Sequence, residues 1–154
     1  MLLLSFQIGD ERYAIDSRQV VEVVPLVQLK PLPHAPAYVA GLFQYRGMVI
    51  PVVDLRQLMQ DEESPQRLST RVILVTYQPD GHPERTIGLV AERVTATIDK
   101  ESSDFAPSGV TVEDTPYLGE VADDGEGLIQ SLTVENLLPD PVRKLLFPET
   151  AEKN

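Results

Sequence analysis

One pattern recurs along the sequence: short, β-branched apolar stretches alternate with polar turns, and this restricts the chain to a mainly β fold. The segments FQIGDERYAIDSRQVVEVV (6–24) and LVTYQPDGHPERTIGLVAERVTATI (74–98) each read as strand, glycine-containing turn, strand, short break and strand. Valine and isoleucine favour strands, and glycine supplies the positive φ of tight turns. The identities are too few to establish a duplication, but two such units predict two small β-barrels packed side by side.

The other elements of the first half are expected to be short. Residues 2–8 read as the first strand, and AYVAGLFQYRG suggests a helical turn that ends near Gly41. The next stretch, MVIPVVDL, reads as a strand in which Pro51 lies at an edge or bulge, because proline cannot donate to a sheet. Asp54 can then cap a short helix, LRQLMQ, which leads into the polar loop DEESPQRLS.

The last third predicts one hairpin and two short helices. PYLGEVADDGEGLIQSL reads as the hairpin, and TVENLL and DPVRKLLF read as the helices. Asp140 is expected to be the N-cap of the second helix, with Pro141 at its first helical position. The length of 154 residues suits a single domain. We therefore expect one domain of two barrel subdomains over residues 1–147 and a flexible tail over 148–154.

Composition limits the partners and the compartment. The chain has no cysteine, which excludes disulfides and thiolate chemistry and fits a cytoplasmic protein. The formal net charge of -11 disfavours nucleic acid and anionic lipid, both of which attract clustered basic side chains. The opening MLLLSFQIGD has a short apolar run without a preceding basic segment. We therefore expect neither a signal peptide nor insertion into a membrane.

The sequence predicts no catalytic residues, no metal site and no cofactor. His34 and His82 occur in separate loop contexts, and no phosphate-binding or nucleophile motif is present. The acidic run at 61–63 suits a solvated loop, and DDGEG at 123–127 is too short for a calcium-binding EF-hand loop. We therefore expect a protein that acts by binding other proteins.

Two charged residues interrupt apolar stretches: Glu22 in VVEVV and Arg46 in FQYRGMVI. In one account each faces solvent from a strand that has one wet side. In the other account the two side chains pair across neighbouring strands in a partly buried place. Burial of such a pair contributes little net stability, so presentation to a partner would be the better reason for keeping it. The sequence alone leaves both accounts open.

Several stretches together resemble the CheW family, the coupling proteins of bacterial chemosensory arrays. They are GDERYAID, VVEVV, HAPAYVAGLFQYRGMVIPVVDL, RVILVTY and IGLVAERV. The resemblance covers about residues 3–138, and GLFQYRGMVIPVVDL is its most specific part. It implies two five-stranded SH3-like β-barrel subdomains with an intervening hydrophobic core and short helices. It also implies that the chain has no enzymatic activity.

The family resemblance further implies an adaptor function. Members bridge the cytoplasmic tip of a chemoreceptor to the regulatory domain of a CheA-type histidine kinase, so that receptor state controls autophosphorylation. The receptor tip docks in the groove between the barrels. CheW-like and kinase regulatory domains also alternate in rings, which adds other CheW-like domains to the expected partners. The chain would then be cytoplasmic and associated with membrane receptor arrays through these partners.

The resemblance assigns roles to five positions. Glu22 and Arg46 match the characteristic glutamate and arginine of the family, which are paired and needed for signalling. Val20 and Gly41 match positions implicated in receptor coupling, and Gly88 matches a glycine near the groove. A structural role is the alternative for the last three: core packing for Val20, and a backbone position with no room for a Cβ for the glycines.

The chain also departs from the family pattern. Ala91 and Glu92 in GLVAERV stand where many relatives have a second valine and an aspartate, and LIQSLTVENLL differs from the usual final strand and helix. The second barrel has therefore drifted. We consider both a general chemotaxis adaptor and a paralogue that serves surface attachment, pili or a cyclic-dinucleotide output.

Two alternative classes remain. A CheV-like adaptor or the regulatory domain of a kinase would be part of a longer chain, which the start at Met1 before the first strand and the short polar tail disfavour. A small-molecule-binding β-barrel would need an apolar cavity. The four Phe and five Tyr residues provide no obvious aromatic lining for one.

Overall fold

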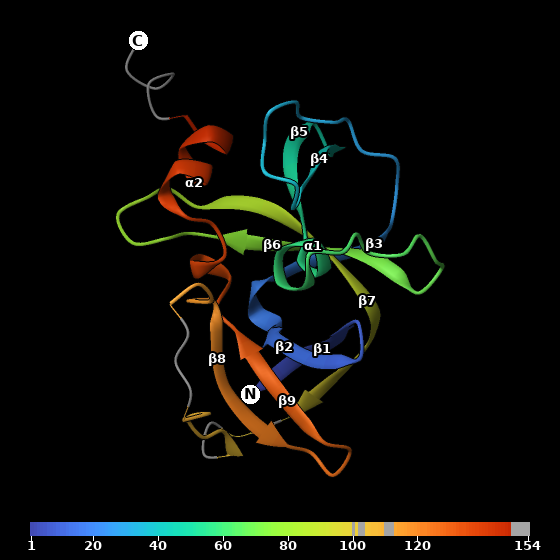
Figure 1. The fold of residues 1–154 in the computed structure, drawn as a ribbon, viewed down its shortest axis with the longest axis vertical. Coiled ribbons are helices and arrows are strands. Elements are labelled where there is room, and N and C mark those ends of the chain that lie inside the picture. The colour runs from blue at the N-terminus through green and yellow to red at the C-terminus, as the bar shows by residue number, and fades with distance from the viewer. Residues whose placement is uncertain (100, 102–103, 110–112, 149–154) are drawn as a thin grey trace.

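The computed structural model (Figure 1) describes residues 1–99, 101, 104–109 and 113–148. Strands dominate and the helices are short, which confirms the prediction of a mainly β fold. The strands are β1 (Leu2–Ile8), β2 (Glu11–Asp16), β3 (Val20–Pro25), β4 (Val39–Tyr45), β5 (Met48–Asp54), β6 (Thr70–Tyr77), β7 (Arg85–Asp99), β8 (Leu118–Asp123) and β9 (Leu128–Leu132). The helices are α1 (Leu55–Gln60) and α2 (Asp140–Leu146), with the 3-10 turns η1 (Ser17–Gln19) and η3 (Val134–Asn136). Except for residue 148, the expected flexible tail lies outside the described residues.

The first group of strands, lobe 1, consists of β1, β2, β8, β9 and the C-terminal part of β7. The strands β1 and β2 form the expected N-terminal hairpin, with Gly9 in its turn at a φ of 61°. On its other side β1 pairs with β7, while β2 pairs in parallel with β9, and β9 pairs with β8. Ala106, which follows β7, bridges Val121 in β8. This bridge closes the circuit of pairing.

The second group, lobe 2, consists of β3, β4, β5, β6 and the N-terminal part of β7. Pairing runs from β3 to β6, β7, β5 and β4. Lys30, which follows β3, bridges Leu42 in β4 through two backbone hydrogen bonds of 2.9 and 2.8 Å, so this circuit also closes. Lobe 2 occupies the upper part of Figure 1 and lobe 1 the lower part. The repeated sequence patterns do not each make one lobe, because β1 and β2 belong to lobe 1 and β3 to lobe 2.

Three apolar clusters fill the molecule. Ile50, Val52, Val72, Leu74 and Val90 form the interior of lobe 2. Leu3, Ala14, Ala122 and Ile129 form that of lobe 1. The largest cluster combines residues of both lobes with η3 and α2. Successive residues of β6 alternate between the lobe 2 interior and this shared cluster, because side chains along a strand point to opposite faces. A strand buried on both faces explains the continuous apolar run in TRVILVTY.

The helical turn expected near Gly41 is wrong, because these residues begin β4. Pairing with β5 and the bridge to Lys30 overrides the local pattern. The register shifts between Val39 and Gly41, which marks a β-bulge. Pro51 lies opposite Leu42, whose own N–H and carbonyl both bond to Lys30. The Pro51 nitrogen therefore faces away from β4, on the side where pairing with β7 begins only at the next residue, Val52.

The two predicted helix caps have different outcomes. Asp54 caps α1 as expected, since its side chain accepts hydrogen bonds from the backbone N–H groups of Arg56 and Gln57. The cap expected at Asp140 is displaced by one residue. Pro139 is the N-cap of α2, and Asp140 is already helical. Its carboxylate then lies in the first turn, where a negative charge is favourable to the helix dipole.

Candidate functional site

Arg46 lies in the tight turn between β4 and β5. Tyr45 pairs with Met48, so the turn contains only Arg46 and Gly47. Their φ angles of 48° and 81° are those of a two-residue type I′ hairpin turn. Glycine adopts this conformation freely, whereas a residue with a Cβ is disfavoured by about 1 kcal/mol. Strain of this kind suggests that the arginine is retained for its side chain rather than for the turn.

Glu22 extends from β3 to meet this turn. The Tyr45 hydroxyl donates a hydrogen bond to Glu22 Oε1, and Arg46 Nη2 lies 3.4 Å from the same oxygen. The Arg46 guanidinium also lies over the Tyr45 ring, 5.1 Å from the ring centroid. The Arg46 side chain is 74% exposed and the Glu22 side chain 40% exposed. We call these three residues the Glu22 cluster.

The sequence analysis did not identify Tyr45. Its ring lies 6.1 Å from that of Phe43 and packs against the lobe 2 interior, which fixes its position. The hydrogen bond to Glu22 raises the pKa of the Tyr45 hydroxyl, because the ionised phenol could no longer donate to the carboxylate. The signal that could have found it is a hydroxyl-bearing residue directly before Arg46 on an otherwise apolar strand.

The two accounts left open for Glu22 and Arg46 each hold in part. The residues are paired, but Arg46 lies in a turn rather than a strand, and the pair is at the surface. An exposed ion pair of this kind contributes little to stability. Val21, Met48 and Val49, next to the cluster in sequence, are exposed apolar residues. The arrangement offers a cation, a carboxylate and apolar surface, which suits protein binding rather than catalysis.

Val20, in the same strand as Glu22, and Gly41 in β4 are held by packing and backbone contacts of their own. Val20 begins β3, pairs with Val75 and packs against the shared apolar cluster. Gly41 is buried and has a φ of 147°, and a Cβ built there would lie 2.5 Å from the Lys30 carbonyl oxygen. Packing explains Val20, and backbone geometry explains Gly41. Their roles in receptor coupling remain predictions.

Gly88 is buried between two strands of lobe 2. A Cβ at this position would lie 2.9 Å from Val72 Cγ1 and 3.0 Å from Val52 Cγ2. Both contacts are closer than ordinary van der Waals separation, so the neighbouring side chains would have to move. The fold therefore explains this glycine as well, and a role near the groove stays a prediction.

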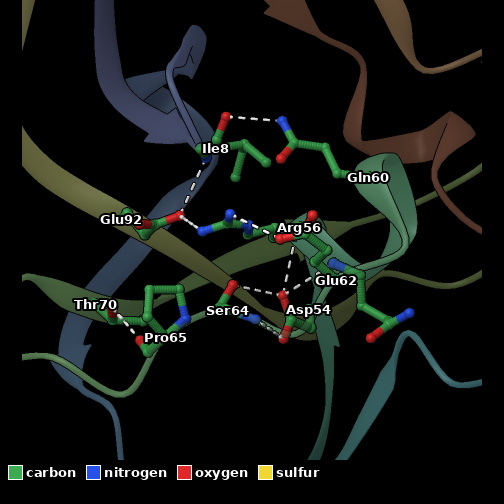
Figure 2. Close-up of polar contacts among 11 residues, drawn as sticks. Ile8, Asp54, Arg56, Gln60, Glu62, Ser64, Pro65, Thr70 and Glu92 are labelled. Carbon is green, nitrogen blue, oxygen red and sulfur yellow. Dashed lines mark hydrogen bonds and ion pairs between the residues drawn. The ribbon is translucent and has the colours of Figure 1, made fainter.

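A second polar group that the sequence analysis missed surrounds α1 and links the two lobes (Figure 2). Arg56 Nη1 lies 3.5 Å from Glu92 Oε2, and this oxygen accepts a hydrogen bond of 3.1 Å from the backbone N–H of Gly9. Gln60 Nε2 donates to the Ile8 carbonyl at 3.0 Å. Helix α1 is thereby attached to the hairpin of lobe 1. The sequence feature that could have indicated this polar group is Glu92, a charged residue that directly follows the apolar residues 89–91 of its strand.

The same polar group fixes the loop that follows α1. Buried Asp54 accepts hydrogen bonds from Ser64, at 2.9 Å from its N–H and 2.6 Å from its hydroxyl (Figure 2). Arg56 contacts Glu62 at 3.0 Å, and the Thr70 hydroxyl donates to the Pro65 carbonyl at 2.6 Å. The polar sequence DEESPQRLS therefore forms a loop with a defined conformation.

Two cavities flank α1. One of about 820 Å³ lies between residues 26–29 and residues 63–68. The other, of about 520 Å³, lies between the turn of the lobe 1 hairpin and α1. None of the five residues singled out from the sequence lines either cavity. The Glu22 cluster is thus a separate surface feature.

Over residues 1–99, 101, 104–109 and 113–148, no three His, Asp or Glu side chains gather as a metal-binding set. In the same part of the chain, no helix is long and apolar enough to cross a membrane.

Known proteins are similar to this chain in sequence and in fold. The family model of the CheW-like domain matches residues 2–142. The chemotaxis protein CheW of Helicobacter pylori is 30% identical over 136 residues, which cover 88% of this chain and 79% of that protein. The chemotaxis protein CheW of Treponema pallidum is 28% identical over 142 residues, covering 88% and 80%.

A solved structure agrees with the sequence relatives. The scaffolding protein TtCheW from Thermoanaerobacter tengcongensis superposes with a TM-score of 0.79 at 25% identity, over 92% of this chain and 89% of that one. The matched residues 2–142 include both lobes, the Glu22 cluster and the polar group around α1. The chain therefore belongs to the CheW-like domain family.

Proposed function

We propose that the protein is a non-enzymatic adaptor that couples chemoreceptors to a CheA-type histidine kinase in a bacterial chemosensory array. The observation that carries the proposal is the family match over residues 2–142. It is supported by relatives named chemotaxis protein CheW and by a structural neighbour described as a scaffolding protein. The Glu22 cluster, an exposed group of charged and aromatic side chains on a β-sheet framework, suits a protein that binds other proteins.

The proposal extends to the domain and the site. Residues 1–147 act as one CheW-like domain in which lobe 1 and lobe 2 are the two barrel subdomains. Glu22 and Arg46 contact or orient a partner at the surface of lobe 2. Val20, Gly41 and Gly88 contribute to coupling by maintaining the shape of that lobe, since each is explained by packing.

The proposed partners are the regulatory domain of the kinase, the cytoplasmic tip of a chemoreceptor and other CheW-like domains in rings. The protein is then cytoplasmic and reaches the membrane through its receptors. The departures at residues 91–92 suggest a paralogue with a non-flagellar output, such as surface sensing or cyclic-dinucleotide control. A small-molecule-binding barrel has no comparable support, because fully buried apolar side chains occupy the interior of each lobe.

The adaptor function is tested by assembly from purified components. The protein is mixed with the regulatory domain of the kinase and the signalling tip of a receptor from the same organism, and the mixture is analysed by size-exclusion chromatography with light scattering. We expect a ternary complex. Failure to bind either component at micromolar concentrations would contradict the proposal.

Arg46→Ala is expected to weaken partner binding about tenfold while leaving the thermal unfolding midpoint near that of the wild type. The exposed side chain makes a surface ion pair, which contributes little to stability, whereas an arginine at an interface can contribute more than 1 kcal/mol to binding. Isothermal titration calorimetry measures the affinity, and differential scanning calorimetry measures the midpoint.

The matched control for this variant is Arg71→Ala, which removes another exposed arginine of lobe 2. It should change neither the affinity nor the midpoint. If Arg46→Ala instead loses cooperative unfolding, the residue is structural, and its assignment as a binding residue is wrong.

A further inference from the structure

We propose that Tyr45 is a positioning residue: it holds the Glu22 carboxylate and so leaves the Arg46 guanidinium available for a carboxylate of the docking partner. The proposal rests on the adaptor function and specifies how its site works. It assigns a role to Tyr45, which the sequence analysis did not identify, and it specifies that the partner presents a carboxylate to Arg46.

Two donors that reach one carboxylate oxygen are the first observation. Both the Tyr45 hydroxyl and Arg46 Nη2 are directed at Glu22 Oε1. The guanidinium nitrogen is 3.4 Å away, at the outer limit for a hydrogen bond. Glu22 is therefore held by the uncharged hydroxyl as well as by a long contact with Arg46.

The state of Arg46 is the second observation. Among the contacts that the described residues make, its guanidinium has one hydrogen-bond acceptor, Glu22 Oε1, although a guanidinium carries five N–H donors. The group is held by stacking over the Tyr45 ring and by the fixed turn, and it is 74% exposed. An oriented arginine with unused donors is matched best by a carboxylate, which can accept two parallel hydrogen bonds.

The rigidity of Tyr45 is the third observation. Its backbone pairs with Met48, and its ring lies against Phe43 and the interior of lobe 2. The hydroxyl is therefore presented at a fixed position, and the ring provides a fixed platform for Arg46. One side chain thus serves both charged residues, by hydrogen bonding to Glu22 and by stacking under Arg46.

Loss of the hydroxyl has a definite consequence in this arrangement. In Tyr45→Phe the ring and its packing are kept, but Glu22 loses the hydroxyl donor, and its carboxylate turns to pair more closely with Arg46. Arg46 must then be withdrawn from Glu22 before it can contact the partner. We expect the affinity for the partner fragment that contacts this surface to fall about three- to tenfold, with an unchanged melting midpoint.

A double-mutant cycle separates positioning from direct contact. In Glu22→Gln the carboxylate that Tyr45 is proposed to hold is absent, so adding Tyr45→Phe to this variant should cause no further loss of affinity. An equal loss from Tyr45→Phe in both backgrounds would overturn the proposal, since the hydroxyl would then contact the partner itself. A loss in Glu22→Gln as large as in Arg46→Ala would also overturn it, because the partner would then recognise the pair.

Tyr38→Phe is the matched control for the removal of a hydroxyl. Tyr38, directly before β4, is also half-buried and packs against the shared apolar cluster, and among the described residues its hydroxyl has no hydrogen-bond partner. The variant should bind the kinase and receptor fragments as the wild type does. A loss of affinity equal to that of Tyr45→Phe would overturn the proposal.

A measurement on the protein alone distinguishes failure of this inference from failure of the adaptor function. In nuclear magnetic resonance spectra the Arg46 Nε–H signal should exchange with solvent more slowly in Tyr45→Phe, because the guanidinium then pairs closely with Glu22. The pKa of Tyr45 should be raised in the wild type and fall toward its ordinary value in Glu22→Gln. An unchanged Arg46 signal would overturn the inference even if the protein binds both partners.

Discussion

Gly41→Ala is expected to lower the free energy of unfolding by about 2–5 kcal/mol. The residue has a φ of 147°, which side chains rarely adopt, and a Cβ would lie 2.5 Å from the Lys30 carbonyl oxygen and 3.0 Å from Leu29 Cβ. Backbone strain contributes about 1–3 kcal/mol and overpacking a similar amount. Because the contact is with backbone, relief requires opening of the bridge between Lys30 and Leu42 that closes lobe 2.

Urea denaturation monitored by circular dichroism measures this change, and Gly47→Ala is the control. Gly47 also has a positive φ, but a Cβ there would meet nothing within 4 Å. We expect a loss of about 1 kcal/mol from backbone strain alone. If the two variants lose the same free energy, the contact with Lys30 is not what requires glycine. If Gly41→Ala keeps wild-type stability but loses receptor binding, the residue has a direct role in coupling.

Asp54→Ala is expected to destabilise the protein by about 2–4 kcal/mol. The buried carboxylate caps α1 and also accepts two hydrogen bonds from Ser64, so its removal leaves the Ser64 N–H and hydroxyl without their acceptor. Loss of an N-cap costs about 1 kcal/mol, and the two Ser64 groups, which a loosened loop exposes to water, together add about 1–3 kcal/mol. Urea denaturation measures the total, and faster proteolysis within residues 61–69 should accompany it.

Ser64→Ala provides the comparison, because it removes only the hydroxyl and leaves the cap and the Ser64 N–H intact. A loss of about 1 kcal/mol is expected. Equal losses in the two variants would show that Asp54 serves the loop alone. An unchanged rate of proteolysis in Asp54→Ala would show that other contacts fix the loop.

Local patterns in the sequence predicted most individual strands, but not how they combine. The β-branched runs and glycine turns identified β1, β2, β3, β5, β6, β8 and β9, and the Asp54 cap identified α1. The short break expected within residues 85–98 is wrong, because β7 is one strand from Arg85 to Asp99. The strand β4 was missed because its pairing partners, β5 and Lys30, determine its conformation, and no local spacing shows them. The strands β1 and β2 belong to one lobe and β3 to the other. This division depends on pairing between distant parts of the chain, such as that of β2 with β9.

The candidate site was predictable to a similar extent. Charges within apolar stretches singled out Glu22 and Arg46, and the structure brings their side chains to 3.4 Å, while their role in signalling stays a prediction. Tyr45 was not found because tyrosine is an ordinary strand residue. Its hydroxyl can bond to Glu22 only because the fold places β3 beside the turn, and the sequence does not show this. The glycines at 41 and 88 were singled out by the family resemblance, but the atoms that exclude a Cβ belong to segments distant in sequence: residues 29–30 for Gly41, and β5 and β6 for Gly88.

The shared strand β7 also bears on the order in which the protein can fold during synthesis. Every strand of lobe 2 lies within residues 20–99, so this lobe is complete when β7 leaves the ribosome. The β1–β2 hairpin, although made first, must wait for β9, whose last residue is Leu132. Its apolar face is uncovered for most of translation, and exposed strands of this kind are prone to aggregation. Lobe 1 is therefore the half of the protein that is completed last and is more exposed to aggregation during translation.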